Sequence, residues 1–573
     1  MFCSILYKKS LAIVTLLESV VKIVKVNESN NAITFNNSII YNNETGTATK
    51  AISTNNNSNI LYKNMILLVF FPSEFFFNIV FGFIILLLFF FCYQHIFFKN
   101  YLNNTLLLFK QRVWVKSELF HICDVFNGIN ILLLIQIIPM FGEIEWTYGQ
   151  QAVALNIIND DHYRTFFKSH WTWGLDGISY WLILMTIFIT IVCTAFVKKK
   201  KDTGQCLNIV IQMFLIELGL ILTFLSTNLL TFYICFEALL IPLYLMIGIS
   251  GSNRSKVKAA YYLVIYTLFG SFFLLAGILY IQRIGGTLDF LAIRSIVFSR
   301  EEQIILFLLF FMPFAIKVPM WPFHIWLPVA HVEAPTVGSI ILASLILKLG
   351  GYGLLRFLPW FPEGFLYWET LIKTCALIGV IYGACVCAIQ FDLKKFIAYT
   401  SVSHMNLMLF GLFSKNVIAI AGCYYMMISH SLVSAALFLS IGILYDRYHT
   451  RNLYYLAGLS EFMPLFSFFY FIFTLSNMAA PLTPNFIGEF LIFTGIGLNS
   501  YSQVCLLGVA IVLSAIYSIW VYNRIMFGTI KYKFITKYID INRIEFVLLL
   551  SITFFLIILG VNSNIILHTL VLY

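Results

Sequence analysis

The chain has 573 residues, of which 60% are hydrophobic and only 11% are charged, with a mean hydropathy of +0.88. A soluble domain of this size would need more polar surface, so the composition excludes a soluble enzyme or binding module. The net charge is +10, but the Lys and Arg residues stand between long apolar runs, where they set membrane topology rather than bind nucleic acid.

Residues 1–65 read as a polar N-terminal extension. A modest apolar stretch at 11–17 is flanked by lysines, as in a targeting helix or a helix that lies on a membrane surface. Residues 26–60 are rich in Asn, Ser and Thr. Segments of that kind bury too little apolar surface to fold alone, so we expect a poorly packed extension.

About fourteen apolar runs follow, most of them near the twenty residues that a helix needs to cross the hydrocarbon core. The runs do not alternate polar and apolar residues as the strands of a membrane barrel do, and lipid leaves no partner for unpaired backbone groups. We therefore predict an all-α, polytopic membrane protein. The predicted spans lie near residues 74–97, 119–140, 175–197, 206–226, 228–250, 259–282, 304–327, 335–356, 371–390, 396–414, 417–445, 463–495, 502–523 and 545–570.

Two of these spans are interrupted by proline. The seventh reads Pro-Phe-Ala-Ile-Lys-Val-Pro-Met-Trp-Pro around Lys317, and the twelfth reads Ala-Pro-Leu-Thr-Pro-Asn-Phe-Ile-Gly-Glu up to Glu489. Proline removes a backbone donor, and a broken helix at membrane depth persists only where protein or water satisfies the freed groups. The breaks stand five spans apart and each carries an ionisable residue, which is the pattern of two inverted five-helix repeats.

This pattern divides the chain into five parts. We expect a polar extension at 1–65, N-terminal transmembrane helices at 66–200, a first five-helix repeat at 201–360, a second repeat at 361–530 and a C-terminal transmembrane helix at 531–573.

Several ionisable residues lie inside the apolar runs, where each costs at least about 2.5–3.5 kcal/mol. Burial disfavours the ammonium form of lysine and a nearby carboxylate restores it, so such a pair can take up and release a proton. Histidine titrates near working pH and can relay protons through water. The residues selected on these grounds are Glu237, Lys317, Lys348, His404, His430 and Glu489, with Glu217 as an auxiliary candidate.

Other interpretations of these residues stay open. A static buried ion pair would also explain the lysines and Glu237, and a lone histidine on a helix is often a satisfied core residue. Glu217 lies one span before Glu237 and could be its hydrogen-bonding neighbour. We expect His324, His331 and Glu333, in the proline-rich connection after the seventh span, to lie near the surface and to serve helix capping or loop packing.

A family resemblance rests on several segments. Residues 314–339 read Phe-Ala-Ile-Lys-Val-Pro-Met-Trp-Pro-Phe-His-Ile-Trp-Leu-Pro-Val-Ala-His-Val-Glu-Ala-Pro-Thr-Val-Gly-Ser and resemble the signature of the antiporter-like membrane subunits of respiratory complex I. Residues 236–242, 347–353 and 392–405 continue the resemblance, which covers about residues 170–525 and is weak over the first 120.

Three paralogous groups share this family's fold, and the twelfth span separates them. Two groups usually place Lys there, whereas the subunit 4 group has Glu after Gly, as in Gly488-Glu489-Phe490 here. The resemblance therefore points to the subunit 4 group. Val329 and Ser431 depart from the family's usual residues at positions that carry no proton-path group.

The resemblance also implies roles for the buried ionisable residues. Glu237 would pair with Lys317, Lys348 would be the central relay, the two histidines would continue the path, and Glu489 would be the terminal exchange residue of the second half-channel. Such a row needs water and an external driver but no cofactor of its own.

The same resemblance implies an enzyme, the proton-translocating NADH:ubiquinone oxidoreductase, of which this chain would be one subunit. NADH, FMN, iron–sulfur clusters and ubiquinone would bind to other subunits. We expect no cofactor or metal in this chain, because its 11 cysteines lie singly apart from Cys385 and Cys387, without a C-x-x-C pair. The implied partners are neighbouring membrane subunits, accessory subunits and membrane lipid such as cardiolipin, with no nucleic acid, in the mitochondrial inner membrane.

Two other functions compete with this one. A subunit of a multi-subunit cation/proton antiporter would carry the same charged groups, and a proton flux driven by a sodium gradient without NADH would favour it. A purely structural membrane scaffold would use the charges as static ion pairs. A scaffold gains nothing from two broken helices that each carry an ionisable residue, so we rank it last.

Overall fold

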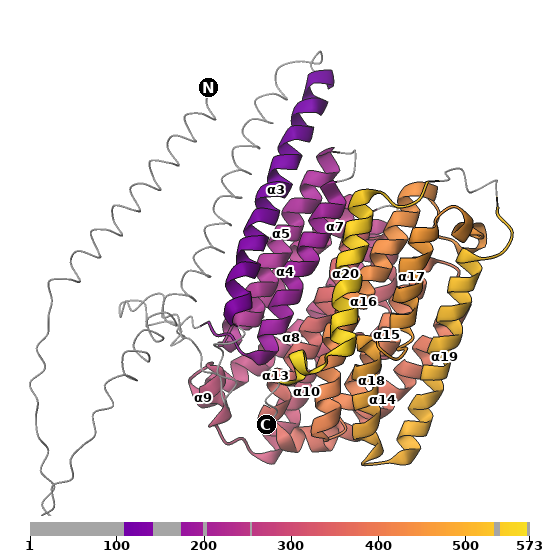
Figure 1. Cartoon of the computed structure of the whole chain (residues 1–573). Coiled ribbons are helices and arrows are strands. Elements are labelled where there is room, and N and C mark those ends of the chain that lie inside the picture. Colours follow the sequence, from indigo (N-terminus) through magenta and orange to yellow (C-terminus); the bar gives the residue numbers. More distant parts are fainter. Residues whose placement is uncertain (1–107, 141–172, 199–202, 252–254, 532–538, 570–573) are drawn as a thin grey trace, which may run out of the picture. The chain divides into compact units, whose positions relative to one another are not determined.

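The computed structural model describes residues 108–140, 173–198, 203–251, 255–531 and 539–569 (Figure 1). The predicted extension at 1–65 and the predicted span at 74–97 lie outside these described residues. All elements described here belong to one compact unit of the chain, residues 66–573.

The described residues are almost wholly helical, as predicted, and they contain isolated β-bridges but no strand. Nine helices in these ranges are long and apolar enough to cross a membrane. That number is below fourteen in part because the two broken spans divide into shorter helices, α10 with α11 and α17 with α18. The helices are α3 (Leu108–Met140), α4 (Gly177–Lys198), α5 (Thr203–Leu225), α6 (Leu229–Ala238), α7 (Leu240–Ser250), α8 (Lys256–Gly285), α9 (Phe290–Arg294), α10 (Arg300–Lys317), α11 (Trp326–Glu333), α12 (Thr336–Ile341), the π-helix η2 (Leu342–Ile346), α13 (Leu347–Phe357), the 3₁₀ turn η3 (Leu358–Trp360), α14 (Pro362–Ile389), α15 (Leu393–Leu412), α16 (Val417–Tyr448), the 3₁₀ turns η4 (Leu453–Tyr455) and η5 (Leu459–Glu461), α17 (Pro464–Asn477), α18 (Pro484–Gly497), α19 (Tyr501–Met526), α20 (Arg543–Val561) and α21 (Asn564–Leu567).

Both predicted breaks are present. The first follows Lys317, and its exposed backbone groups find partners within the protein: Trp326 Nε1 donates to the carbonyl of Ile316 at 3.0 Å, and Asn406 Nδ2 donates to the carbonyl of Pro319 at 3.1 Å. The second break separates Asn477 from Pro484. Because the freed groups are paired, the irregular backbone can persist at membrane depth.

A third interruption lies in the predicted span 228–250, beside Glu237. Helix α6 ends at Ala238 and α7 begins at Leu240. Pro242 has no backbone N–H, so the carbonyl of Ala238 loses its partner four residues on, and the ring crowds the preceding turn. The sequence contained this signal, but the prediction treated the span as continuous.

Small residues let helices α16 and α18 approach one another closely. A Cβ atom on Gly422 of α16 would lie 2.8 Å from the backbone N of Ile492 and 2.9 Å from the carbonyl O of Gly488, both on α18. A Cβ atom on Gly488 would lie 3.0 Å from the Cα of Met426. Backbones that pack this closely are typical of helix interfaces in membranes.

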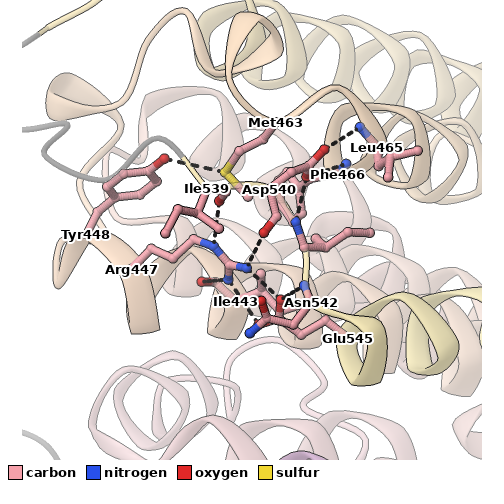
Figure 2. Close-up of polar contacts among 11 residues, drawn as sticks. Ile443, Arg447, Tyr448, Met463, Leu465, Phe466, Ile539, Asp540, Asn542 and Glu545 are labelled. Atoms are coloured by element: carbon pink, nitrogen blue, oxygen red, sulfur yellow. Dashed lines mark hydrogen bonds and ion pairs between the residues drawn. The ribbon is translucent and has the colours of Figure 1, made fainter.

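A buried charge network fixes the start of α20 against α16 and α17 (Figure 2). Arg447, at the end of α16, donates to both carboxylate oxygens of Glu545, at 3.0 and 2.6 Å, and to the carbonyls of Ile539 and Asp540. Asp540 in turn accepts from the backbone N–H groups that open α17, those of Leu465 and Phe466. Three helix ends therefore share one set of polar contacts.

The expected surface position of His324, His331 and Glu333 is wrong. Their exposed fractions are 4%, 0% and 7%. His331 and Glu333 lie on α11, which is the second half of the first broken helix and not a surface connection. The proline-rich sequence suggested a loop, whereas the chain re-enters the helical core after the break.

Candidate functional site

Lys317 is the last residue of α10 and is 2% exposed. Its Nζ lies 3.1 Å from the centre of the Phe236 ring and 3.5 Å from the carbonyl O of that residue. An ammonium group is stabilised both by an aromatic face and by the negative end of its helix. Glu237 is the next residue after Phe236 and lies within electrostatic range of Lys317, although the two side chains form no direct ion pair. The structure thus brings this predicted pair together through Phe236.

Lys348 begins α13, directly after the π-helical turn η2, and is 1% exposed. A π turn disturbs the regular pattern of backbone hydrogen bonds and is frequent at functional sites. Here Lys348 Nζ donates to the carbonyl of Ala343 within that turn, at 2.7 Å. The same Nζ lies 2.8 Å from Nδ1 of His430 on α16. The two groups can therefore share a proton directly.

The two histidines lie side by side, on α15 and α16. The ring centres of His404 and His430 are 5.7 Å apart. His404 Nδ1 lies 3.1 Å from Oε1 of Glu489, which is on the second turn of α18 near the positive end of that half-helix. All three side chains are at most 5% exposed. Lys348, His430, His404 and Glu489 thus form one row of buried ionisable groups, each in contact with the next.

The close packing of α13 on α10 fixes the position of Lys348 relative to Lys317. A Cβ atom on Gly350 would lie 2.5 Å from Cγ2 of Val318 and 3.0 Å from the carbonyl O of Phe314. Only a glycine permits this approach, two residues from Lys348 and directly beside the end of α10. Among the described residues, no hydrogen bond or ion pair joins Lys317 to Lys348.

Several buried polar atoms near the row and near Lys317 have no hydrogen-bond partner among the residues that the structure describes. They include Oε1 of Glu237, Nε2 of His404, both side-chain atoms of Asn485 and the hydroxyl of Tyr517. Buried polar groups need a hydrogen-bond partner, and internal water is the usual one. The prediction missed Asn485 and Tyr517. The sequence carries a signal for Asn485, which lies in the proline motif before Glu489, but it carries none for Tyr517.

Glu217 occupies a separate polar cluster. Its Oε1 lies 2.9 Å from the hydroxyl of Thr190 on α4, and its Oε2 accepts from Asn130 Nδ2 on α3 at 3.2 Å. Glu217 is 3% exposed and forms no ion pair within the described residues. The alternative in which Glu217 is the hydrogen-bonding neighbour of Glu237 is therefore wrong, because the partners of Glu217 are Asn130 and Thr190 on other helices.

An ion pair that the sequence did not indicate, between buried Arg356 and partly buried Asp176, lies at the end of α13. The guanidinium of Arg356 pairs with Asp176, just before α4, and also donates to the hydroxyl of Tyr352. Burial by itself would raise the pKa of Asp176, but the charge of Arg356 and the hydrogen bonds from Ser179 hold that pKa below its usual value. The pair fixes the end of the helix that carries Lys348.

Comparisons with known proteins show the family to which the chain belongs. The family model described as "NADH:quinone oxidoreductase/Mrp antiporter, TM" matches residues 226–516, about half of the chain. The protein named NADH-ubiquinone oxidoreductase chain 4 of Marchantia polymorpha is 46% identical over 398 residues, which is 69% of this chain and 80% of that protein. The protein of the same name from Chondrus crispus is 43% identical over 70% of this chain and 81% of its own length.

Two solved structures show the same fold. A chain of respiratory complex I from Thermus thermophilus superposes with a TM-score of 0.70 at 26% identity, over 78% of this chain and 93% of that one. A chain of the Mrp complex from a Dietzia species superposes with a TM-score of 0.70 at 18% identity, over 80% of this chain and 92% of that one. The predicted polytopic antiporter-like fold is thereby confirmed. The chain belongs to the NADH:quinone oxidoreductase/Mrp antiporter membrane family and, within it, to the family of NADH-ubiquinone oxidoreductase chain 4.

Proposed function

We propose that this chain is a core membrane-arm subunit of an NADH:ubiquinone oxidoreductase and that it translocates protons along its buried ionisable residues. The single observation that carries this proposal is the row Lys348–His430–His404–Glu489, buried and linked by 2.8 Å and 3.1 Å contacts at its two ends. A static ion pair needs two such groups and not four, and the two histidines at its centre are the side chains best suited to proton relay.

Proton transfer along the row follows from its contacts. When Lys348 is an ammonium ion, it donates to Nδ1 of His430, so that neutral His430 carries its own proton on Nε2. Transfer of the lysine proton to Nδ1 leaves a neutral amine and an imidazolium ion. His404 receives a proton next, through water or through rotation of the rings, which are 5.7 Å apart. Its Nδ1 then passes a proton to the carboxylate of Glu489.

The first half-channel would be controlled by Glu237 and Lys317. The negative charge of Glu237 stabilises the ammonium form of Lys317, and a shift of Glu237 away from it favours release of the proton. The helix break after Lys317 allows the backbone beside this residue to change conformation. Oε1 of Glu237 has no hydrogen-bond partner among the described residues, which favours a water-filled path beside it. Glu217, with only neutral partners, would remain outside this path as a structural neighbour.

The organisation and setting of the chain belong to the same proposal. We assign the two half-channels to the repeats at 201–360 and 361–530, with 66–200 and 531–573 as flanking transmembrane helices. Redox cofactors, namely NADH, FMN, iron–sulfur clusters and ubiquinone, would bind to other subunits. Other antiporter-like subunits, accessory subunits and lipid would surround the chain in the mitochondrial inner membrane, which agrees with the eukaryotic sources of its relatives.

The test is the replacement Lys317→Met, with the exposed Lys258→Met as the matched control. Both variants are compared in assembled complex in sealed membranes, and protons pumped per NADH oxidised are measured. We expect Lys317→Met to lose most of its proton pumping, because methionine fills the same space but carries no proton, while Lys258→Met pumps like the natural chain. Equal pumping by the two variants would contradict the proposal.

The second candidate, a subunit of a cation/proton antiporter, is favoured by one observation, the shared fold of the Mrp complex. A native gel of mildly solubilised membranes separates the two functions. Co-migration of the chain with a large NADH-oxidising band supports the first proposal. Migration in a smaller assembly without NADH activity, together with proton flux driven by a sodium gradient, would favour the antiporter.

A further inference from the structure

At the end of α11, each of the four residues 331–334 forms a hydrogen bond with a side chain from outside the helix. The hydroxyl of Ser339 donates to the carbonyl of His331 at 3.0 Å, and the hydroxyl of Ser255 lies 2.8 Å from Oε1 of Glu333. Arg451 Nη1 donates to the carbonyl of Val332 at 2.5 Å. The last carbonyls of a helix have no partner within it and carry partial negative charge, so these contacts stabilise the end of α11.

The fourth contact comes from Lys394, which is 3% exposed and whose Nζ lies 2.6 Å from the carbonyl O of Ala334. Lys394 stands in the first turn of α15. A cation there is disfavoured by the positive end of its own helix, and burial adds a further cost. The neighbouring helix stabilises this cation, because the ammonium group reaches the negative end of α11.

The two cations belong to one short piece of structure. Leu393 N donates to the carbonyl of Arg451 at 3.0 Å, and Leu453 N donates to the carbonyl of Phe391 at 2.8 Å, which forms the bridge between Asp392 and Asn452. This bridge stands directly before α15, which carries His404, and shortly after α16, which carries His430. Movement of this helix pair is therefore transmitted to both cations together.

On these contacts we propose that Lys394 and Arg451 are positioning residues that clamp the second half of the first broken helix to the α15–α16 pair. The clamp links the break after Lys317 with the two histidines of the row, so that the two half-channels change conformation together. This inference rests on the proposed function for its consequence in proton pumping. Its structural part, the attachment of α11, can be measured without that function.

The experiment uses the assembled complex with Lys394→Met, with Lys395→Met as control and Lys394→Arg as the conservative variant. Lys395 is the exposed neighbour on the same turn, and arginine can still donate to the carbonyl of Ala334. We expect Lys394→Met to show at least twofold lower proton pumping per NADH than Lys395→Met, and Lys394→Arg to restore it. Deuterium exchange of the backbone over 330–334 should become at least several-fold faster in Lys394→Met alone.

The outcomes separate this inference from the proposed function. Unchanged pumping and unchanged exchange in Lys394→Met would overturn the clamp. Faster exchange with normal pumping, while Lys317→Met loses pumping, would overturn its role in coupling. Normal pumping in both Lys394→Met and Lys317→Met would instead reject the proposed function. If Lys394→Met fails to assemble, Arg451→Met, which removes the other donor of the clamp, takes its place, and exchange over 330–334 equal to that of Lys395→Met would overturn the clamp.

Discussion

Glu217 lies among three helices with partners that carry no charge, and its hydrogen bonds bear on its protonation state. The Thr190 hydroxyl has one proton and lies 2.9 Å both from the carbonyl of Ile187 and from Oε1 of Glu217. If the hydroxyl donates to the carbonyl, as is common in helices, the short contact with Oε1 requires a proton from Glu217. Both N–H groups of Asn130 are then used, one on Thr190 and one on Oε2. This arrangement predicts a neutral carboxylic acid.

The prediction compares Glu217→Gln with Glu217→Ala. The amide of glutamine reproduces a donor and an acceptor, so we expect normal assembly and pumping. Alanine leaves one N–H group of Asn130 without its buried acceptor, which costs about 1–3 kcal/mol. Thermal inactivation of the complex measures this difference, and an infrared carbonyl band of a protonated carboxyl should vanish in Glu217→Gln. Loss of pumping in Glu217→Gln at normal stability would instead make Glu217 a member of the proton path.

At the scale of the elements, the close packing of α16, which carries His430, on α18 fixes the position of the helix that carries Glu489. Gly422 faces the backbone of α18, so Gly422→Ala must push the two helices apart. Overpacking of this kind costs about 1–3 kcal/mol, and we expect reduced pumping because Glu489 moves with α18. The matched control is Gly508→Ala on α19, where an added Cβ meets nothing within 4 Å. The control should gain about 0.5–1 kcal/mol of helix stability. Thermal inactivation and proton pumping measure both effects, and equal behaviour of the two variants would refute this account.

At the scale of the whole molecule, the Arg447–Glu545 pair joins residues 98 positions apart and attaches the C-terminal helix α20 to α16 and α17 (Figure 2). Glu545 is 0% exposed, so Arg447→Met removes the cation that neutralises a buried carboxylate and should cost about 3–5 kcal/mol. The double variant Arg447→Met with Glu545→Leu should recover much of that loss, because both charges are gone. A double-mutant cycle on the thermal inactivation of the complex tests this, and additive effects would show that the pair is not coupled.

Much of the fold followed from local patterns in the sequence. Long apolar runs dictate helices in lipid, and the prolines around Lys317 and Glu489 predicted the two breaks that the structure contains. The prediction failed where a local pattern has two meanings. The proline-rich segment after Lys317 resembles a surface loop, yet His331 is fully buried, because the chain resumes a helix after the break and packs on α8 and α15.

By itself, the sequence determined that this is a polytopic helical membrane protein, which ionisable residues lie in its apolar spans, and which family its motifs resemble. These properties depend on residue type and spacing along the chain. Only the tertiary structure decided which of these residues meet: Lys348 with His430, His404 with Glu489, Lys394 with α11, and Glu217 with Thr190 instead of Glu237. The physical reason is that hydrogen bonds act over about 3 Å, whereas these partners are separated by tens of residues and are brought together only by helix packing.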